Sequence, residues 1–442
     1  MNEEQIIHGK DYHKWAYKKV KESDVLLTGG LSVHFAMVQF ILDCARGANP
    51  NIKTIAGGGL ISSEPELMAD VLKLDYAVVG EGEEIVLDIL TGKEINKIVK
   101  SKSIENIDNL PFPDYEGLQV SNYLDRQLCG DEHYTYPEDN PRCLPIISSR
   151  SCPYSCTFCF HPTGKKYRQR SIENFGKEVE YLKTKFNINI LTVLDELIST
   201  NHERLEAICK VLKEFKIKWM TQMRVDTVTK EMMAMMKDAG CYQISFGIEH
   251  IDEKVLKSMR KKITKEEIEN ALRLASSEGI GIQGNILIGD VAETGESITK
   301  ALKWLIENER YGINCNLIIP YPATKLYRDY VASKHIPDKL EYIRKGCQFV
   351  PHKNFNYPEC YDIPRYLEHK KPLEAEILEK KQTIFDKYRG QLYDVKIKCY
   401  HCKEEVEYKD LYQNSTGGSM LWHGWYRIGC KKCNQRTDFK LQ

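Results

Sequence analysis

Short apolar runs alternate with helical patterns over two long stretches of this 442-residue chain, residues 24–90 and 144–320. No other feature of the sequence constrains the fold as strongly. Strands that alternate with helices build parallel sheets, because each helix carries the chain back to the starting end of the sheet. The alternation therefore predicts an α/β protein whose sheets are parallel.

The first stretch predicts an N-terminal Rossmann-like parallel sheet within residues 1–100. The expected strands are 25–28, 52–56 and 76–79, and the expected helices are 36–45, 64–72 and 83–90. The apolar runs end in glycines, and parallel sheets bind ligands at the carboxyl ends of their strands. Residues 101–140 carry prolines among polar and acidic residues, so we expect a partly ordered linker there.

The second stretch predicts a central partial (β/α)6 barrel within residues 141–335. The expected strands are 145–148, 188–194, 217–221, 242–246, 280–288 and 314–319. Between them lie helical patterns with apolar residues at three- and four-residue spacing. In such barrels the functional residues lie on the loops that follow the strands. Beyond the barrel we expect a helical extension over 336–390, with a charged helix near 372–387.

The charge balance excludes some classes of protein. Lys+Arg and Asp+Glu each number 63, so the formal net charge is zero, which argues against a protein that coats nucleic acid or binds anionic membranes. Residues 1–15 lack the apolar core of a signal peptide. The apolar stretch 25–45 contains His34 and Asp43, which argues against a membrane span. We therefore expect a cytoplasmic location.

Three of the 15 cysteines stand at C-x3-C-x2-C spacing in SRSCPYSCTFCFHP, directly after the first expected barrel strand. In a chain with no export signal, such a group indicates metal ligation rather than disulfides. A [4Fe–4S] cluster is usually held by four cysteines, so Cys152, Cys156 and Cys159 would leave one iron open. The alternatives are a zinc loop or incidental cysteines, but zinc sites normally use paired CxxC knuckles with four ligands.

This spacing, with Phe158 before the last cysteine, resembles the signature of the radical S-adenosylmethionine (SAM) superfamily. The resemblance implies that the open iron of the cluster binds SAM. It further implies reductive cleavage of SAM to a 5′-deoxyadenosyl radical, which abstracts hydrogen from a substrate. A low-potential electron donor such as flavodoxin or ferredoxin is the implied partner. The cofactors carry the radical chemistry, so we assign no catalytic acid or base.

The resemblance extends over residues 140–330. It implies SAM contacts from the loop and the strand ends, namely Phe158, Glu196, Arg224, Glu249, Gly284 and Gly289. The segment YRQRS at 167–171 is similar to the basic turn that follows the cluster loop in cobalamin-associated members. GNILIGDVAE at 284–293 matches the adenine-contact segment of the family more loosely. PYPAT at 320–324 is similar to a PYPGT segment at the last strand, with Ala323 in place of the glycine.

The N-terminal stretch is similar to the cobalamin-binding domain that precedes many radical SAM enzymes. The residues that match its corrin-binding positions are Gly29, Gly30, Ser32, Gly57, Gly58, Gly80 and Gly82. Glycines suit such positions because they let the backbone approach a large ligand closely. Two departures stand out: the opening βα unit is abbreviated, and the DxHxxG loop with an axial histidine is absent. The alternative is a degenerate domain that only covers the barrel.

Two CxxC pairs lie in the C-terminal segment, residues 391–442, with 27 residues between the pairs. Cys399, Cys402, Cys430 and Cys433 would enclose a tetrahedral site for Zn²⁺ or, next, a rubredoxin-like iron. A bound ion would also explain how a small segment with little core folds. We expect a zinc-ribbon-like domain whose aromatic residues form its own core.

Several functions remain open on this sequence. Bound cobalamin would favour methylation of an unactivated carbon, whereas its absence would favour radical dehydrogenation, rearrangement or C–C bond formation. A more distant alternative is a non-catalytic iron–sulfur electron-transfer or sensing protein. An RNA-modifying enzyme is disfavoured by the neutral charge. No feature of the sequence identifies the substrate. Four further cysteines are candidates for an auxiliary cluster, although buried thiols are the simpler interpretation: Cys129, Cys143, Cys347 and Cys360.

Overall fold

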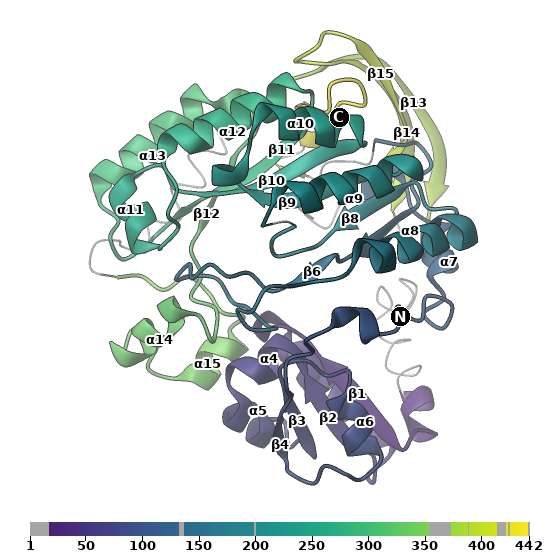
Figure 1. The fold of residues 1–442 in the computed structure, drawn as a ribbon, viewed down its shortest axis with the longest axis vertical. Coiled ribbons are helices and arrows are strands. Elements are labelled where there is room, and N and C mark those ends of the chain that lie inside the picture. The colour runs from purple at the N-terminus through teal and green to yellow at the C-terminus, as the bar shows by residue number, and fades with distance from the viewer. Residues whose placement is uncertain are drawn as a thin grey trace. The chain divides into compact units, whose positions relative to one another are not determined.

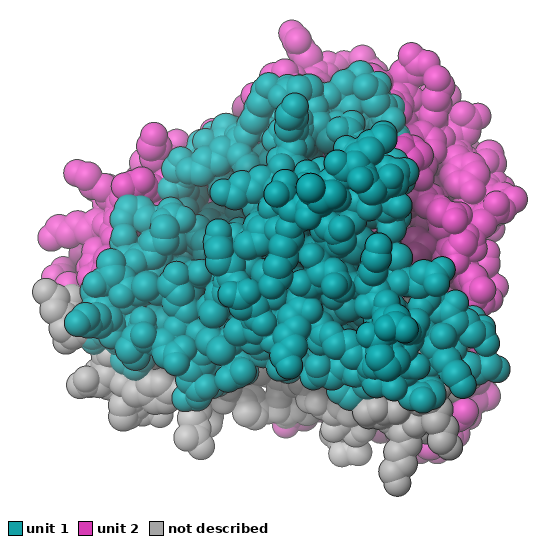
Figure 2. All heavy atoms as spheres, turned by 90° about the horizontal axis from the view of Figure 1, so that it is seen from below, with its two compact units in different colours: residues 1–110, 151–168, 318–353 teal, residues 111–150, 169–317, 354–442 magenta. Residues whose placement is uncertain are grey.

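The computed structural model of the chain describes residues 17–131, 137–198, 200–352, 373–387, 389–412, 421–422 and 425–440. The chain divides into two compact units, which Figure 2 colours separately. Unit 1 contains residues 1–110, 151–168 and 318–353, and unit 2 contains residues 111–150, 169–317 and 354–442. Within the described residues, no helix is both long enough and apolar enough to cross a membrane.

Unit 1 is built on a four-stranded parallel sheet with the strand order β1-β2-β3-β4 (Figure 1). Its strands are β1 (Val25–Gly29), β2 (Lys53–Gly57), β3 (Tyr76–Val79) and β4 (Ile98–Lys100). Its connecting helices are α3 (Phe35–Ala48), α4 (Gly58–Ser63), α5 (Pro65–Val71) and α6 (Ile85–Leu90). The three strands expected from the sequence are confirmed, and β4 is an additional one.

Unit 1 is discontinuous in sequence. Helices α14 (Lys325–Ala332) and α15 (Lys339–Arg344) follow the second sheet of the chain but belong to this unit. Ile343 and Cys347 are buried in the same apolar cluster as Val38 and Leu42 of α3. The core behind the N-terminal sheet is therefore completed by a segment about three hundred residues further along the chain.

Unit 2 is built on a six-stranded parallel sheet with the strand order β5-β8-β9-β10-β11-β12. Its strands are β5 (Cys143–Ile146), β8 (Ile190–Val193), β9 (Lys218–Arg224), β10 (Cys241–Glu249), β11 (Gly281–Ile288) and β12 (Asn314–Leu317). Its helices are α8 (Ile172–Phe186), α9 (His202–Glu214), α10 (Lys230–Asp238), α11 (Glu253–Ser258), α12 (Lys265–Ser277) and α13 (Gly295–Glu307). All six expected strands are confirmed, and this α/β arrangement is consistent with a partial (β/α)6 barrel.

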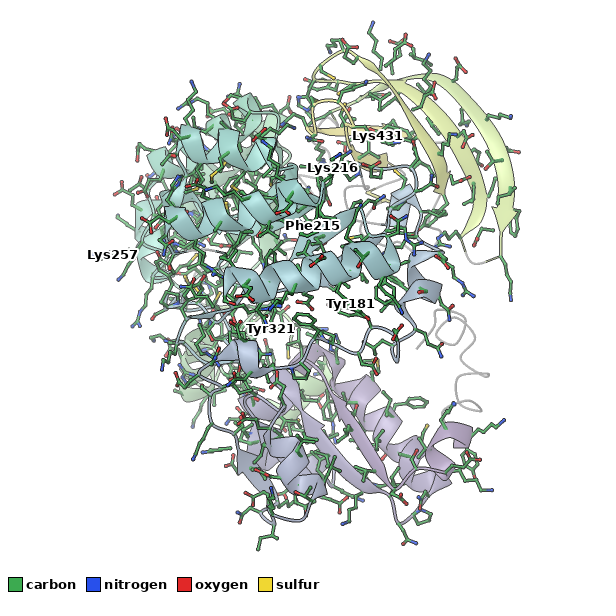
Figure 3. All side chains as sticks on the ribbon, turned by 45° about the vertical axis from the view of Figure 1, so that its right-hand side comes forward. Tyr181, Phe215, Lys216, Lys257, Tyr321 and Lys431 are labelled. Atoms are coloured by element: carbon green, nitrogen blue, oxygen red, sulfur yellow. The ribbon has the colours of Figure 1, made fainter. Side chains whose placement is uncertain are left out.

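The segment expected to be a partly ordered linker is packed where the structure describes it. It contains the helical turns Ile107–Asn109, Val120–Leu124 (α7) and Cys129–Asp131. The Tyr115 hydroxyl donates to Glu178 Oε1 of α8 at 2.7 Å, and its ring centroid lies 6.2 Å from that of Tyr181, labelled in Figure 3. Prolines and acidic residues indicate irregular backbone, and these contacts hold that backbone in place.

The C-terminal region contains a three-stranded antiparallel sheet of β13 (Glu376–Asp386), β14 (Gly390–Lys398) and β15 (Glu405–Tyr412). A second antiparallel sheet contains β16 (Leu421–Trp422), β17 (Trp425–Gly429) and β18 (Arg436–Lys440). The helix expected at 372–387 is wrong, because Glu376–Asp386 form β13. As an edge strand with mostly exposed side chains, β13 carries the charged sequence that also suits a surface helix.

Candidate functional site

The three-cysteine loop, residues 151–168, belongs to unit 1. It follows β6 (Ser149–Arg150) and ends at β7 (Arg168–Gln169). Cys152 and Cys156 are half-buried and Cys159 is exposed, so the thiols lie where a soft metal group can reach them. Phe158 is half-buried on the same loop.

Hydrogen bonds hold the loop in a defined shape. The backbone N–H of Cys159 donates to the carbonyl of Cys156 at 3.3 Å, closing a turn between two of the cysteines. Ser151 has a positive φ of 70°, and its hydroxyl lies 2.9 Å from Thr163 Oγ1. The backbone N–H of Leu326 donates to the carbonyl of Thr157 at 2.9 Å.

The PYPAT segment lies just before α14 in unit 1. Thr324 caps α14 by accepting a hydrogen bond from the backbone N–H of Tyr327 at 3.1 Å. Ala323 has a positive φ of 68°, a conformation in which glycine is strain-free and alanine is not. The glycine of the related segment is thus replaced at a position whose backbone still favours glycine.

The predicted glycines of unit 1 lie at the carboxyl ends of the first three strands. Gly29 of β1 stands opposite Gly57 of β2, and a Cβ on Gly29 would lie 2.7 Å from the Gly57 carbonyl oxygen. Gly58 has a φ of +78°, and a Cβ there would lie 3.0 Å from the Gly30 carbonyl oxygen. These glycines let two strand ends approach each other closely.

The remaining predicted corrin-binding positions surround this pair of strand ends. Gly80 has a φ of +93°, and no atom lies closer than 3.8 Å to a Cβ placed on Gly82. Ser32 is buried, with its hydroxyl 3.4 Å from that of Ser63. Leu31 beside it is 50% exposed, so an apolar side chain stands in solvent next to the glycines.

His34 does not offer an axial ligand through its Nδ1 atom. That atom accepts a hydrogen bond from the backbone N–H of Leu31 at 3.1 Å. A Cβ on Gly30 would lie 2.9 Å from the same Nδ1 atom, so the imidazole packs directly on the glycine turn. His34 Nδ1 therefore does not replace the histidine of the DxHxxG loop that the sequence lacks.

In unit 2, two of the predicted SAM-contact residues belong to one network at the ends of β9 and β10. Lys261 Nζ donates to Glu249 Oε1 at 2.8 Å. Arg224 pairs with Asp226 at 2.8 Å and donates to the carbonyl of Lys261 at 2.9 Å. Lys261 is 6% exposed, and a Cβ on Gly247 would lie 2.5 Å from its Nζ atom. Sequence reasoning missed Lys261, because no motif marks a lysine that must pass over a glycine.

The turn after β11 is fixed by a second buried network. Glu293 Oε2 accepts the backbone N–H of Gly289 at 2.7 Å, and Glu293 Oε1 accepts from Ser297 Oγ at 3.1 Å. His250 Nε2 lies 2.9 Å from Glu293 Oε1, and both side chains are fully buried. Burial raises the pKa of the neighbouring Asp290. Gly289 thus lies in a turn shaped by Glu293, which the sequence placed only in a loosely matching segment.

The other predicted SAM-contact positions have contrasting surroundings. Glu196 is exposed, whereas Asp195 is fully buried and accepts hydrogen bonds from the N–H and hydroxyl of Ser148 at 2.6 and 2.5 Å. Desolvation raises the pKa of Asp195. A Cβ on Gly284 would lie 2.7 Å from Ile248 Cδ1, so this glycine makes room for neighbouring strand residues. The Asp195 carboxylate, after β8, therefore joins the ends of β5 and β8 through its hydrogen bonds with Ser148.

The four C-terminal cysteines form a candidate metal centre. The Sγ atoms of Cys399, Cys402, Cys430 and Cys433 lie within 4.8 Å of one another. The backbone N–H groups of His401 and Lys432 donate to the Sγ atoms of Cys399 and Cys430, both at 3.4 Å. Hydrogen bonds from Cys430 and Cys433 lower the pKa of the Cys399 thiol. Four soft ligands in this arrangement suit a tetrahedral metal ion.

The second cysteine knuckle is docked on the starts of two strands of the six-stranded sheet. Asn434 Nδ2 donates to the Gly279 carbonyl and Gln435 Nε2 to the Ile280 carbonyl, each at 2.9 Å. Arg436 donates to the Gly312 carbonyl at 2.8 Å. The knuckle therefore satisfies backbone carbonyls just before β11 and β12. Lys431 in the knuckle, labelled in Figure 3, stacks on the Tyr408 ring at 4.6 Å.

The cysteines considered for an auxiliary cluster lie in different cores. Cys129 packs with the C-terminal sheets, Cys143 packs with β8, and Cys347 packs with the helices of unit 1. Burial raises the pKa of the Cys129 and Cys347 thiols to about 12. Cys360 lies outside the described residues. Buried thiols of high pKa are poor metal ligands.

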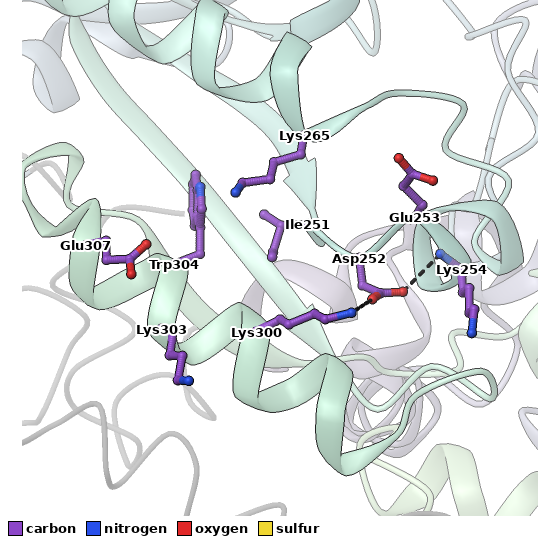
Figure 4. Close-up of a pocket in the computed structure, with 9 residues that line it drawn as sticks. All are labelled: Ile251, Asp252, Glu253, Lys254, Lys265, Lys300, Lys303, Trp304 and Glu307. Carbon is purple, nitrogen blue, oxygen red and sulfur yellow. Dashed lines mark hydrogen bonds and ion pairs between the residues drawn. The ribbon is translucent and has the colours of Figure 1, made fainter.

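A surface pocket lies among the helices that follow β10 and β11 (Figure 4). Its volume is about 550 Å³, and it is lined by residues of α11, α12, α13 and the turn before α11, among them Asp252, Lys265, Lys300 and Trp304. Lys300 pairs with Asp252 at 3.3 Å and with Glu296 at 3.1 Å. None of the predicted cofactor-binding residues lines this pocket.

Two curated methyltransferases are similar to the chain in sequence. An uncharacterized methyltransferase of Pyrococcus horikoshii is 26% identical over 341 residues, which cover 72% of each protein. A bacteriochlorophyllide d C-8(2)-methyltransferase of Chlorobaculum tepidum is 26% identical over 295 residues, covering 63% of this chain and 62% of that protein. The chain thus spans less than two thirds of the second relative.

Two solved structures share the fold. The radical SAM methyltransferase TsrM of Kitasatospora setae, with cobalamin and a [4Fe–4S] cluster bound, has a TM-score of 0.59 at 15% identity, covering 74% of this chain and 70% of that one. The cobalamin-dependent SAM radical enzyme OxsB has a TM-score of 0.53 at 19% identity, covering 82% and 55%. At these identities the likeness establishes the fold alone.

The model of one protein family covers the three-cysteine loop and most of the six-stranded sheet. The radical SAM superfamily model matches residues 146–305, from the last residue of β5 into α13. Membership of that superfamily implies a [4Fe–4S] cluster and SAM as cofactors. Residues 146–305 therefore form a radical SAM domain, and the chain is an enzyme of the radical SAM class.

Proposed function

We propose that this protein is a cobalamin-dependent radical SAM methyltransferase that acts on an unactivated carbon. The observation that carries the proposal is that the three-cysteine loop and the glycine-rich strand ends belong to one compact unit. Methyltransferases among the relatives, and the fold shared with TsrM and OxsB, support it. The substrate is a small molecule or a peptide that presents such a carbon.

Cys152, Cys156 and Cys159 are the proposed cluster ligands. Three thiols on one loop, with Cys159 exposed, fit a cluster that keeps one iron open. When bound, the cluster supplies a low-potential electron and a coordination site for SAM. The protein holds the loop by the hydrogen bonds at Ser151, Cys159 and Thr157, which limit how far the thiols can move.

In unit 2, the residues that we propose to contact SAM lie at the strand ends. Glu249 and Arg224 belong to the network of Lys261, which fixes their side chains before any ligand binds. The Gly289 turn is held by Glu293, and the exposed Glu196 and the strand glycine Gly284 complete the set. The protein's work is to orient SAM and to exclude water.

Cobalamin is proposed to bind on the Rossmann-like sheet of unit 1. The residues that would hold it are Gly29, Gly30, Ser32, Gly57, Gly58, Gly80 and Gly82. The glycines present bare backbone, and Leu31 beside them exposes an apolar side chain, as a large ligand with an apolar face requires. His34 Nδ1 is engaged by the backbone, so we expect binding without an axial histidine from this turn.

Two further parts of the proposal concern the surroundings of the reaction. We expect Zn²⁺ in the four-cysteine centre of a zinc-ribbon-like C-terminal domain, because four thiolates at tetrahedral spacing are its usual structural set. We also expect flavodoxin or ferredoxin as the electron donor, and a cytoplasmic location, where thiols and low-potential clusters stay reduced.

The test combines absorbance and product analysis. Anaerobically reconstituted protein is mixed with hydroxocobalamin, desalted and examined for corrin absorbance. It is then incubated with SAM, reductant and candidate substrates. The proposal predicts retained corrin, and both S-adenosylhomocysteine and 5′-deoxyadenosine among the products. 5′-Deoxyadenosine without retained corrin or S-adenosylhomocysteine would instead support a cobalamin-independent radical reaction.

A further inference from the structure

We propose that Arg168 is a positioning residue for the cluster. Through a buried ion pair with Glu81, it fixes the three-cysteine loop to the turn that follows β3. The three-cysteine loop and the turn after β3, which are proposed to hold the cluster and cobalamin, then move as one body. This inference rests on the proposed function only for the identity of the groups that the two loops hold.

The ion pair is almost completely removed from solvent. Arg168 Nη1 lies 2.6 Å from Glu81 Oε2, and the two side chains are 4% and 2% exposed. The same Glu81 oxygen accepts the backbone N–H of Ile104 at 2.8 Å, and Arg168 Nη1 donates to the Ile104 carbonyl at 2.7 Å. The guanidinium and the carboxylate therefore share a third, backbone partner.

Arg168 also holds the loop that it terminates. Its Nη2 atom donates to the Thr163 carbonyl at 3.1 Å and lies 3.4 Å from Ser151 Oγ. One guanidinium thus binds the beginning and the later part of the three-cysteine loop at once. The planar fork of arginine suits this role, because its donors point in fixed and different directions.

Glu81 lies at the carboxyl end of β3 in the sheet of unit 1. It stands between Gly80 and Gly82 in the turn after β3. Gly80 has a φ of +93°, and a Cβ there would lie 2.7 Å from Ser101 Oγ, so the turn has little freedom. A buried ion pair is poor evidence for added stability, but it specifies one arrangement of the groups around it.

Two more contacts anchor the loop to the same unit. A Cβ on Gly59 would lie 2.9 Å from Phe160 Cε1, so the Phe160 ring rests directly on the backbone after β2. The Leu326 N–H donates to the Thr157 carbonyl at 2.9 Å. The loop is thus held at Thr157, Phe160 and Arg168. Lys166 also pairs with Glu105, but that ion pair is exposed, whereas the pair of Arg168 with Glu81 is buried.

Arg170 provides a matched control two residues away. It pairs with Glu178 of α8, and the side chains are 7% and 3% exposed. Arg168 closes a segment of unit 1, whereas Arg170 and Glu178 both belong to unit 2. The two arginines have the same side chain and similar burial. They form their ion pairs in different units, and this difference is what the control uses.

The test compares Arg168→Gln and Glu81→Gln with Arg170→Gln by hydrogen exchange. Losing a charge-assisted hydrogen bond should raise amide exchange in peptides 101–104 and 151–168 by about tenfold in the first two variants. Arg170→Gln should leave those peptides unchanged. Arg168→Lys keeps the charge but loses the fork, and should give an intermediate increase. Unchanged exchange in Arg168→Gln and Glu81→Gln, or an equal increase in Arg170→Gln, would overturn the inference.

A spectroscopic measurement addresses the cofactors themselves. Pulsed electron paramagnetic resonance measures the distance between the reduced cluster and cob(II)alamin in the loaded protein. We expect a narrow distance distribution in the wild type and one about twofold broader in Arg168→Gln, because the loops no longer move together. Equal widths would contradict the inference. If the wild type binds no cobalamin, the proposed function loses its corrinoid, and the exchange experiment still decides the role of Arg168.

Discussion

Arg168 and Arg170 stand two residues apart in one short segment, yet each forms its buried ion pair inside a different compact unit, Arg168 with Glu81 and Arg170 with Glu178. The chain passes from unit 1 to unit 2 between them. The three-cysteine loop therefore belongs structurally to the glycine-rich sheet, although in sequence it sits among the strands of the other unit. This assignment places both proposed cofactor loops within one unit.

Removing the loop cysteines should separate the two metal sites. When Cys152, Cys156 and Cys159 are replaced together by alanine, we expect the iron and sulfide content to fall by about four of each per chain. The metal at Cys399, Cys402, Cys430 and Cys433 should remain, because those residues form a separate group. Elemental analysis of anaerobically reconstituted protein measures both. Sulfide-bearing iron that persists in the triple variant would reveal an additional cluster and refute the assignment.

Removing the C-terminal metal should loosen the start of two strands of the six-stranded sheet. Cys430→Ser breaks the centre whose knuckle binds the carbonyls of Gly279, Ile280 and Gly312. Metal binding contributes folding energy directly, so hydrogen exchange at 279–283 and 312–316 is expected to rise about tenfold or more.

The matched control for that experiment is Cys209→Ser, which changes a buried thiol of α9 outside the metal centre. It should leave exchange at 279–283 near that of the wild type. Equal exchange in the wild type and Cys430→Ser would show that the knuckle docks without its ion, contrary to the account.

Glu293→Ala should destabilise unit 2 and weaken SAM binding. The substitution leaves the Gly289 N–H without its buried acceptor and removes the buried carboxylate beside His250 Nε2. We expect the free energy of unfolding to fall by about 3 kcal/mol. Urea unfolding and equilibrium dialysis with SAM measure the two effects. Glu296→Ala, in the first turn of the following helix α13, is the control, since its side chain is 79% exposed and the loss of unfolding free energy should be below about 0.5 kcal/mol. A stable Glu293→Ala protein with normal SAM affinity would contradict the assigned role.

Alkylation should distinguish Cys347 from the loop cysteines. Burial raises the pKa of Cys347 to about 12, so about one thiol in ten thousand is ionised at pH 8. Only the thiolate reacts, so the alkylation rate should rise about tenfold for each pH unit up to that pKa. Mass spectrometry of metal-free protein treated with iodoacetamide should find Cys159, which is exposed, modified long before Cys347. Comparable rates at pH 8 would mean that Cys347 is accessible and reactive.

The parallel strands could be predicted from the sequence because apolar runs bounded by glycines and helices mark them directly. The grouping of the four C-terminal cysteines could be predicted as well, since ligand spacing is a local property. β4 escaped prediction because Ile98–Lys100 is too short for a period to be visible. β13 was predicted as a helix because an exposed edge strand and a surface helix carry similar charged residues.

Long-range pairs could not be predicted. Glu81 and Arg168 are 87 positions apart, and neither lies in a pattern that names its partner. Lys261 becomes meaningful only when the fold brings it over Gly247 to Glu249. Asp195 likewise accepts its hydrogen bonds from residues far away in the sequence, Ser148 and Ser149. Such roles depend on tertiary contacts that a single sequence does not display.

The most direct test of the central claim is reductive cleavage of SAM by the anaerobically reconstituted wild type. With dithionite or reduced flavodoxin, the account predicts 5′-deoxyadenosine in amounts that exceed the protein, and none from the Cys152/Cys156/Cys159 triple alanine variant. A fully loaded cluster that yields no 5′-deoxyadenosine, or equal yields from the wild type and the triple variant, would contradict it.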